Sequence, residues 1–235
     1  MSFANAFTPE RLQEAWNCLL TEFPYAIWET LYSTFLATLF ALIIGLPLGV
    51  LLVIGEPDGI RPMPKWLMAF LNVFINLLRS VPFIILVVMI IPLTRAIVGT
   101  SVGTVASIVP LTVAAFPFIA RLVESSLREV NPNIIETAQS MGATPRQIII
   151  HVMLVESVPS LITNITLAIT TIMGYTAMSG AVGGGGLGRL ALSYGYQRYR
   201  YAILYLAVIV LVIITQIIQS FGTWLARKSD KRLKS

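Results

Sequence analysis

The sequence predicts an all-α polytopic membrane protein with five transmembrane helices. Of its 235 residues, 56% are hydrophobic and 11% are charged, and the mean hydropathy is +0.81. Soluble globular domains carry far more charge than this. Several apolar runs are about 20 residues long, the length that a helix needs to cross a hydrocarbon core of about 30 Å. The fold is therefore expected to be a bundle of membrane-spanning helices.

Residues 1–29 are expected to form an amphipathic, extracytoplasmic segment. They lack the basic start followed by an apolar core that marks a signal peptide. Between Pro9 and Leu20, apolar residues recur at helical spacing, which predicts a short helix on the membrane surface. Trp28 and Tyr32 then fit the aromatic belt where a first span enters the bilayer.

The transmembrane domain is expected over residues 30–226, with its first span over 30–54. This span contains Gly45, Pro47 and Gly49, a GxxxG pattern with a proline inside it. Small residues at this spacing allow two helices to approach closely, and the proline allows a kink. A tolerated patch of small residues accounts for the pattern equally well at this point.

The second span is expected over residues 66–92, after a charged loop rich in Pro and Gly at 55–65. The apolar block is long for one straight helix, so it is expected to tilt or to begin as an interfacial helix. It contains Arg79, and an arginine at membrane depth costs about 3 kcal/mol or more. Arg79 is therefore a candidate pathway or gate residue. The alternative is an arginine bonded to backbone carbonyls near a bend.

Three further spans are expected at 104–122, 148–178 and 201–225. The fourth span is rich in threonine and contains Asn164. Such side chains hydrogen-bond across helices or line a pathway, and simple packing is their commoner role. Residues 227–235 form a basic tail that is expected to lie in the cytoplasm.

No catalytic or metal-binding pattern is evident. Cys18 and His151 are the only residues of their types, which argues against an internal disulfide and a His/Cys metal site. A G-x-G-x-x-G pattern occurs within 180–188, but neither the strand nor the distant acid of a dinucleotide site accompanies it. No P-loop pattern occurs. Glu156 is the one acidic residue expected near a span interior, without an evident partner, so an intramembrane enzyme is the weakest hypothesis.

The basic residues indicate a membrane orientation rather than a nucleic-acid partner. The chain has 16 Lys and Arg against 11 Asp and Glu, and its pI is about 9.6. With the C-terminus inside, the inner loops and tail carry ten basic residues and the outer segments five, and Arg79 stays in the membrane. The positive-inside rule therefore predicts an outer N-terminus and a cytoplasmic C-terminus.

The polar stretch at 131–147, NPNIIETAQSMGATPRQ, separates two long apolar runs. Asn131 and Pro132 are a typical helix start, and Gly142 supplies a left-handed stop. Thr144, followed by Pro and then by Gln147, predicts a capping box at the start of a second helix. The stretch is therefore expected to be a short exposed helix, a glycine turn and a helix that re-enters the membrane. An ordinary helical hairpin loop is the alternative.

The same stretch resembles the EAA loop of ATP-binding-cassette importer permeases. Their pattern is E-A-A-x3-G-x9-I-x-L-P, and this chain has E-T-A at 136–138, Gly142, and V-M-L-V at 152–155. In that family the loop is a cytoplasmic coupling helix that docks into a cleft on the ATPase. The resemblance implies that ATP and Mg bind to the ATPase and not to this chain. The coupling residues that it implies are Glu136, Thr137, Ala138, Gly142 and Ala143.

Two longer blocks, at 76–103 and 174–188, resemble the permease subunit of methionine importers, and the similarity covers roughly residues 25 to 225. It implies a subunit of the bacterial inner membrane that assembles with a second copy of itself. It also implies an ATPase dimer and an extracytoplasmic, lipid-anchored binding protein that delivers methionine. No nucleic-acid partner is expected.

A substrate site within the membrane is expected to involve Met173, Tyr175 and Met178, since soft apolar side chains suit a thioether. Most methionines in membrane helices serve packing, which is the plainer interpretation. Two other functions stay open at this point. One is an importer permease for a different, polar amino acid, and the other is a channel or carrier that needs no ATPase.

Overall fold

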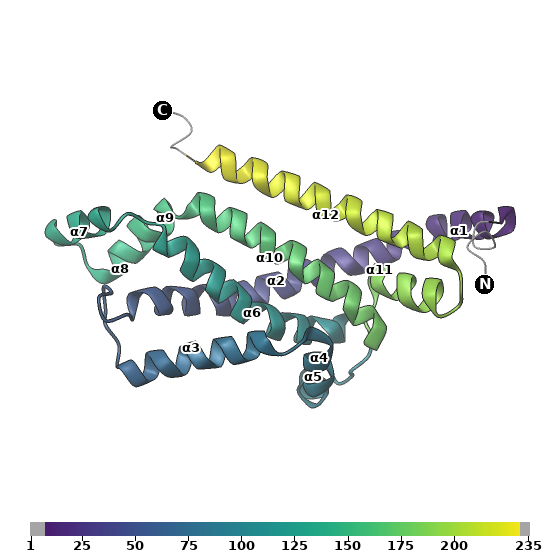
Figure 1. Ribbon diagram of the computed structural model, residues 1–235, viewed down its shortest axis with the longest axis horizontal. Helices are drawn as coiled ribbons and strands as arrows, with labels where there is room; N and C mark the ends of the chain where they lie inside the picture. The colour runs from purple at the N-terminus through teal and green to yellow at the C-terminus, as the bar shows by residue number, and fades with distance from the viewer. Residues whose placement is uncertain (1–7, 231–235) are drawn as a thin grey trace. The chain divides into compact units, whose positions relative to one another are not determined.

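The computed structural model describes residues 8–230, and helices are the only regular elements in this range (Figure 1). The all-α prediction is confirmed for these residues. Lys231, Arg232 and Lys234 of the predicted basic tail lie outside the described residues. In chain order the elements are α1 (Pro9–Thr21), α2 (Phe23–Ile54), α3 (Lys65–Ser80), α4 (Phe83–Met89), α5 (Ile91–Val98), α6 (Thr104–Arg128), α7 (Pro132–Ser140), α8 (Pro145–Gln147), a π-helix (Ile148–Met153), α9 (Leu154–Glu156), α10 (Val158–Ser179), a 3-10 turn (Gly180–Val182), α11 (Gly186–Arg189), a second π-helix (Leu190–Tyr196) and α12 (Tyr201–Ser229).

Four segments of the described chain are helices long and apolar enough to cross a membrane. They are α2, α6, α12 and the stretch Val158–Val182, and a fifth span results if α3 and α4 count as one bent span. The helix expected near the N-terminus is present as α1, and its position on the membrane surface stays a prediction. The first, third and fifth spans are also present, each with a longer helix than expected.

The second expected span, 66–92, is not one continuous helix. Helix α3 ends at Ser80, and Val81 and Pro82 are extended, with ψ angles of 123° and 135°. Proline has no N–H to donate and sterically disfavours a helical conformation of the residue before it. The Val81-Pro82 pair therefore breaks the helix, and Arg79 lies in the last turn of α3.

The fourth expected span, 148–178, is also interrupted. It begins as the π-helix Ile148–Met153, continues as the short α9, and becomes a regular α-helix only with α10. Pro159 lacks the N–H that would bond to the carbonyl four residues earlier. This missing bond accounts for the break near Ser157, and the apolar span begins at Val158.

The described chain divides into two compact units, each made of three separate segments. The described parts of Met1–Thr38, Pro82–Val113 and Ile169–Ile218 form unit 1. Those of Leu39–Val81, Ala114–Ala168 and Gln219–Ser235 form unit 2.

The core of unit 1 joins α1, the start of α2, and the helical turns that follow the glycine run. Phe23, Leu187, Leu190 and Ile203 are almost fully buried in one cluster, together with Ala15 of α1. The buried residue of the surface helix therefore belongs to this core.

The core of unit 2 depends on the GxxxG pattern of α2. A Cβ atom on Gly45 would lie 2.8 Å from the carbonyl oxygen of Phe116, and one on Gly49 would lie 2.6 Å from that of Ala120. Real Cβ atoms do not approach backbone oxygens so closely. The two glycines therefore let α2 pack directly on α6, and the close-approach interpretation of the pattern is confirmed.

Candidate functional site

The loop at 131–147 forms in the way its capping residues predict. The Asn131 side chain accepts a hydrogen bond from the Asn133 N–H at 3.0 Å, and Pro132 is the first residue of α7. Gly142 has a φ of +78°, the left-handed conformation that ends the helix. Thr144 and Gln147 form a capping box at the start of α8. These local predictions are confirmed.

None of the nine residues of helix α7 is buried, and all but the half-buried Ile135 and Ala138 are exposed. Thr137 and Ser140 donate hydrogen bonds to carbonyls of their own helix, so their side chains do not hold α7 to its surroundings. The Met141 side chain, just after the helix, is 82% exposed, and Glu136 is exposed as well. The exposed surface thus combines a carboxylate with apolar side chains, a mixture suited to a protein partner.

The inner side of α7 faces a cavity of about 380 Å³. Ile135, Glu136 and Gln139 line it from α7. The loop after α2 lines it from another side, through Glu56, Asp58, Gly59 and Ile60. Leu127 and Arg128 contribute the end of α6. Helix α7 therefore lies over a hollow instead of a packed core, which leaves room for it to shift.

A network of charged and amide side chains surrounds Glu124 on α6. The Glu124 side chain is only 10% exposed, and it accepts a hydrogen bond from Arg121 at 2.6 Å and another from Arg128 at 2.8 Å. Arg121 also donates to the side-chain oxygens of Asn72 and Asn76 on α3, at 2.7 and 3.1 Å. The network therefore joins two helices of unit 2.

Arg128 extends the same network to the loop after α2. Its guanidinium forms a two-pronged ion pair with the Glu56 carboxylate while it also bonds to Glu124. Guanidinium and carboxylate groups match in geometry, so such pairs fix orientation as well as distance. Glu56 and Arg128 both line the cavity beside α7, so this network supports the walls of that cavity.

Arg79, the arginine proposed for a pathway or gate, has different surroundings. It is exposed, and it makes no hydrogen bond or ion pair with any of residues 8–230. The alternative of an arginine bonded to nearby carbonyls is therefore not what the structure shows. Arg121 has that kind of environment, with its side chain 19% exposed and bonded to two amide groups and a carboxylate.

The three predicted substrate-site residues all belong to unit 1, and each has a different environment. Met173 is buried, and its sulfur accepts a hydrogen bond from the Thr215 hydroxyl at 3.2 Å. The Tyr175 ring stacks on Phe83 with 4.8 Å between ring centroids, whereas Met178 is 46% exposed. The structure does not bring these three side chains together into one site.

The glycine run at 183–186 docks on a buried carboxylate in unit 1. Glu29, which is 7% exposed, accepts hydrogen bonds from the Thr104 hydroxyl at 2.5 Å and from the Gly186 N–H at 2.8 Å. The neighbouring Thr30 hydroxyl accepts one from the Leu187 N–H at 2.9 Å. The run is therefore a tight structural junction.

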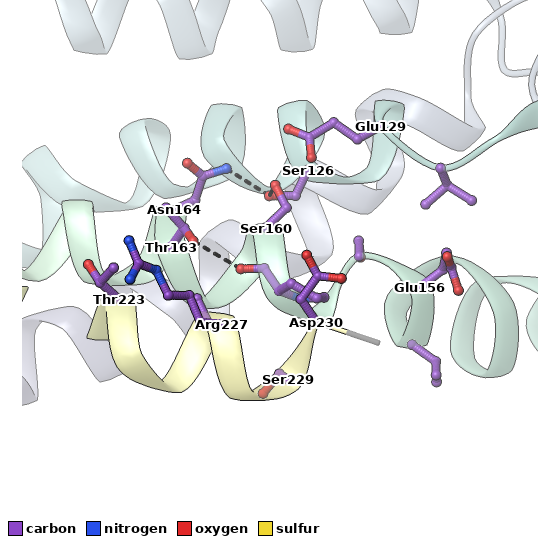
Figure 2. Close-up of a pocket in the computed structure, with 15 residues that line it drawn as sticks. Ser126, Glu129, Glu156, Ser160, Thr163, Asn164, Thr223, Arg227, Ser229 and Asp230 are labelled. Carbon is purple, nitrogen blue, oxygen red and sulfur yellow. Dashed lines mark hydrogen bonds between the residues drawn. The ribbon is translucent and has the colours of Figure 1, made fainter. Parts of the chain in front are cut away.

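A second cavity of unit 2, of about 510 Å³, lies among the ends of α6 and α12 and the start of α10 (Figure 2). Hydroxyl and amide groups form one wall, where Asn164 donates to the Ser126 hydroxyl at 2.8 Å and Ser160 donates to the same oxygen at 3.1 Å. Arg227 and Asp230 of α12 and its end line the opposite wall. Within residues 8–230 no cluster of His, Cys, Asp and Glu suits a metal ion.

A model of the family described as "Binding-protein-dependent transport system inner membrane component" matches residues 45–235. The chain belongs to this family. It is therefore a multi-pass inner membrane component of a transport system, and the matched range includes α7, the Glu124 network and the glycine run.

Relatives of this inner membrane component agree along most of the chain. It is 47% identical over 208 residues to a probable D-methionine transport system permease protein MetI of Vibrio cholerae, covering 88% of this chain and 92% of the relative. It is 49% identical to the D-methionine transport system permease protein MetI of Escherichia coli K12, over 66% of this chain and 70% of the relative.

Solved structures of transporters have the same fold as this inner membrane component. An inward-facing structure of the MetNI methionine ABC transporter matches with a TM-score of 0.88 and 44% identity, over 91% of this chain and 98% of that chain. An amino acid ABC transporter crystallised with histidines has a TM-score of 0.75 at 17% identity, which shows the fold alone.

Sequence reasoning missed the two buried carboxylates of this inner membrane component. The expected spans place only Glu156 among the acidic residues near a span interior, yet Glu29 and Glu124 are both buried and hydrogen-bonded within candidate spans. Two signals in the sequence were available. A carboxylate at the edge of an apolar run needs partners, and Arg121 and Arg128 lie three residues before and four after Glu124, the spacing of helix ion pairs.

Proposed function

We propose that this chain is the permease subunit of an ATP-driven importer that carries methionine across the bacterial inner membrane. The observation that carries the proposal is its 47% identity, over 88% of the chain, to a probable D-methionine permease. A TM-score of 0.88 to a methionine ABC transporter structure supports it further. The transport family itself leaves the substrate open, so the methionine assignment rests on these two similarities.

The working assembly contains two copies of this chain, two ATP-binding-cassette ATPase subunits that bind ATP and Mg, and an extracytoplasmic, lipid-anchored binding protein. Helix α7 supplies the contact with the ATPase. Its exposed outer face and its cavity-lined inner side support this role, because a helix that docks into a moving partner needs a free face and room to shift.

The coupling contact consists of the exposed surface of α7 and the turn that follows it. Its residues are Glu136, Thr137, Ala138, Gly142 and Ala143. When ATP binding closes the ATPase, α7 moves as a rigid piece and pulls on α6 before it and on the π-helix after it. The Glu124 network keeps α3 attached to α6 during this motion, so three helices respond together.

The N-terminus lies outside and the C-terminus in the cytoplasm, as the bias of basic residues indicates. This orientation puts α7 on the side that holds ATP. A reporter fused after Ser235 is expected to be cytoplasmic, and one before Met1 extracytoplasmic. Both reporters on one side of the membrane would contradict the five-span topology.

Arg79, Tyr175 and Met178 are accessible to some degree in the isolated chain and remain the proposed pathway residues. Met173 is included as the buried neighbour that positions this part of α10, since its sulfur bonds to Thr215. Substrate selection rests mainly on the binding protein.

Reconstituted uptake tests the function. Vesicles that contain the co-purified transporter, with the binding protein outside and ATP at the ATPase, are expected to accumulate labelled methionine, and unlabelled methionine is expected to compete. Uptake that persists without ATP or an ion gradient would indicate a channel, and uptake driven by an ion gradient would indicate a carrier. ATPase stimulation by a different amino acid and its own binding protein, with none by methionine, would refute the substrate assignment.

A further inference from the structure

The 510 Å³ cavity of unit 2 has a composition that neither coupling nor a methionine pathway requires. Figure 2 shows charged side chains on different walls, with Glu129 near the end of α6 and with Arg227 and Asp230 at the end of α12. Glu156 adds a carboxylate from the turn before α10. Three acids and one arginine therefore line a single hollow, together with hydroxyl groups.

The neutral wall of this cavity is already saturated with internal hydrogen bonds. Asn164 donates to Ser126 and to the Leu122 carbonyl, while Thr163 and Thr223 each donate to a carbonyl of their own helix. The Asn164 bonds join α10 to α6, and the two threonine hydroxyls are already used within their own helices. Recognition of a ligand must therefore depend on the charged groups.

Two of those charged groups have no partner within the described residues. Arg227 and Glu129 are exposed, and neither forms a hydrogen bond or an ion pair with any of residues 8–230. An arginine offers a planar fork of donors that suits a phosphate, and a carboxylate suits an ammonium group. The cavity thus presents separate positions for an anion and for a cation.

The depth of the cavity in the membrane follows from the end of α12. This helix is a candidate span, and near its end the Lys228 ammonium lies 5.1 Å from the centre of the Trp224 ring. Tryptophan collects at the membrane–water interface, and lysine beside it extends its charge into the headgroup layer. Arg227 and Asp230 flank Lys228, so the cavity opens at the depth of lipid headgroups.

We propose that this cavity binds the headgroup of a phospholipid with a primary ammonium group, namely phosphatidylethanolamine. The phosphate lies against Arg227, and the ammonium donates its N–H groups to the Glu129 carboxylate. A lipid with a phosphate and no ammonium leaves the Glu129 carboxylate without a donor. A choline headgroup has the same charge but no N–H donor, so it loses these hydrogen bonds.

Lipid retention measures this selectivity directly. The full-length protein is purified and placed in nanodiscs that contain either ethanolamine or choline phospholipid, each with the same fraction of phosphatidylglycerol. Native mass spectrometry then counts the lipids that stay bound. An ethanolamine lipid is expected to be retained about tenfold more than a choline lipid, the equivalent of one charge-assisted hydrogen bond.

Variants assign the selectivity to the cavity. Arg227→Gln and Glu129→Gln each remove one charge at an exposed position, and both are expected to reduce the preference to about twofold or less. Lys228→Gln is the matched control, because it removes a charge from the same turn of α12 but does not line the cavity. This control is expected to keep the preference.

Equal retention of the ethanolamine and choline lipids by the wild-type protein would overturn the proposal, and this comparison needs no variant. A loss as large in Lys228→Gln as in Arg227→Gln would also overturn it, because attraction to the membrane surface would then explain the binding. Free methionine is added in a separate arm, since an amino acid is also a zwitterion. Displacement of the lipid by millimolar methionine would assign the cavity to an amino acid instead.

Discussion

In unit 1 the buried Glu29 is held by neutral donors, whereas in unit 2 the buried Glu124 is held by two arginines. The partners of Glu29 are a hydroxyl and a backbone N–H, and these are short groups that must be brought to within 2.8 Å by the chain itself. The partners of Glu124 are long side chains that reach it from one turn away on the same helix.

The two junctions therefore differ in how far they tolerate an added side chain or a movement of their helices. A backbone donor reaches a carboxylate only where no side chain intervenes, so the unit 1 junction requires glycine. Arginine side chains adjust their torsions to follow a moving partner, so the unit 2 junction can persist while α6 shifts. We infer that unit 1 contains a fixed junction and that unit 2 contains an adjustable one close to α7.

The largest expected effect is at the fixed junction. A Cβ atom on Gly185 would lie 1.8 Å from the Thr104 hydroxyl oxygen and 2.8 Å from a carboxylate oxygen of Glu29. Gly185→Ala is therefore expected to separate the glycine run from α2 and to destabilise the protein by about 3 kcal/mol. The measurement is the yield of membrane-inserted protein together with its thermal midpoint in detergent.

The control for this prediction is Gly174→Ala. A Cβ at Gly174 would meet nothing within 4 Å, and the residue lies inside α10, so alanine there is expected to be neutral or slightly stabilising. Equal stability of the two variants would mean that the glycine run is not a fixed junction.

A smaller effect is expected at the adjustable junction. Arg121→Met removes the ion pair with Glu124 and the bonds to Asn72 and Asn76, but Arg128 still compensates the carboxylate. Because the arginine side chain is partly exposed, the expected loss is about 1–2 kcal/mol. Methionine uptake is expected to fall more than ATPase activity, since α3 no longer follows α6.

Arg146→Met serves as the control for Arg121→Met, because it removes an exposed arginine of α8 that does not belong to the network. It is expected to leave stability and uptake close to those of the wild type. If Arg121→Met also leaves the ratio of uptake to ATP hydrolysis unchanged, the network has no part in coupling.

Contacts between residues close in the chain were predictable from the sequence, whereas the contacts of the Glu29 junction were not. The caps at Asn131 and Thr144 and the turn at Gly142 were predicted correctly because their partners lie within five residues. The bond from Gly186 to Glu29 was not predictable in this way, since 157 positions separate the two residues. Periodicity reports which face of a helix is apolar, but it does not report which distant segment will meet that face.

The same limit applies to the two arginines Arg79 and Arg121. Reading 66–92 as one span put Arg79 at membrane depth, whereas the helix ends at Ser80. The Val81-Pro82 dipeptide is a local sequence signal for this break. The partners of Arg121 on α3 are 45 and 49 positions away, so only the structure brings them together.

Gly142→Val, in the turn after α7, is expected to lower stability about as much as Arg121→Met does. Its consequence for function is different. Gly142 has a φ of +78°, and a Cβ there would meet nothing within 4 Å, so the cost of Gly142→Val is purely conformational. This cost is about 1–2 kcal/mol. The variant is expected to insert and dimerise, but to lose ATPase capture because the turn no longer presents α7 correctly.

Gly99→Val is a closely matched control for Gly142→Val. Gly99 ends α5 in unit 1 with a φ of +82°, and a Cβ there would also meet nothing within 4 Å. The two variants are expected to lose similar stability, while only Gly142→Val loses the co-purified ATPase. If both retain the ATPase and wild-type uptake, the loop is only a connector.

The smallest expected effect concerns the charge on α7 itself. Glu136 is exposed and has no ion pair within residues 8–230, so Glu136→Ala is expected to change stability by less than about 0.5 kcal/mol. An exposed charge at a partner interface contributes about 1 kcal/mol, so the affinity for the ATPase is expected to fall roughly fivefold. Raising the ionic strength is expected to reduce the difference in ATPase affinity between variant and wild type, because salt screens exposed charges.

Glu10→Ala is the control. It removes an exposed carboxylate from α1 in unit 1 and is expected to leave the ATPase affinity unchanged. Equal ATPase affinities for Glu136→Ala and wild type at low salt would show that Glu136 is merely solvated, and the apolar side chains of α7 would then supply the contact.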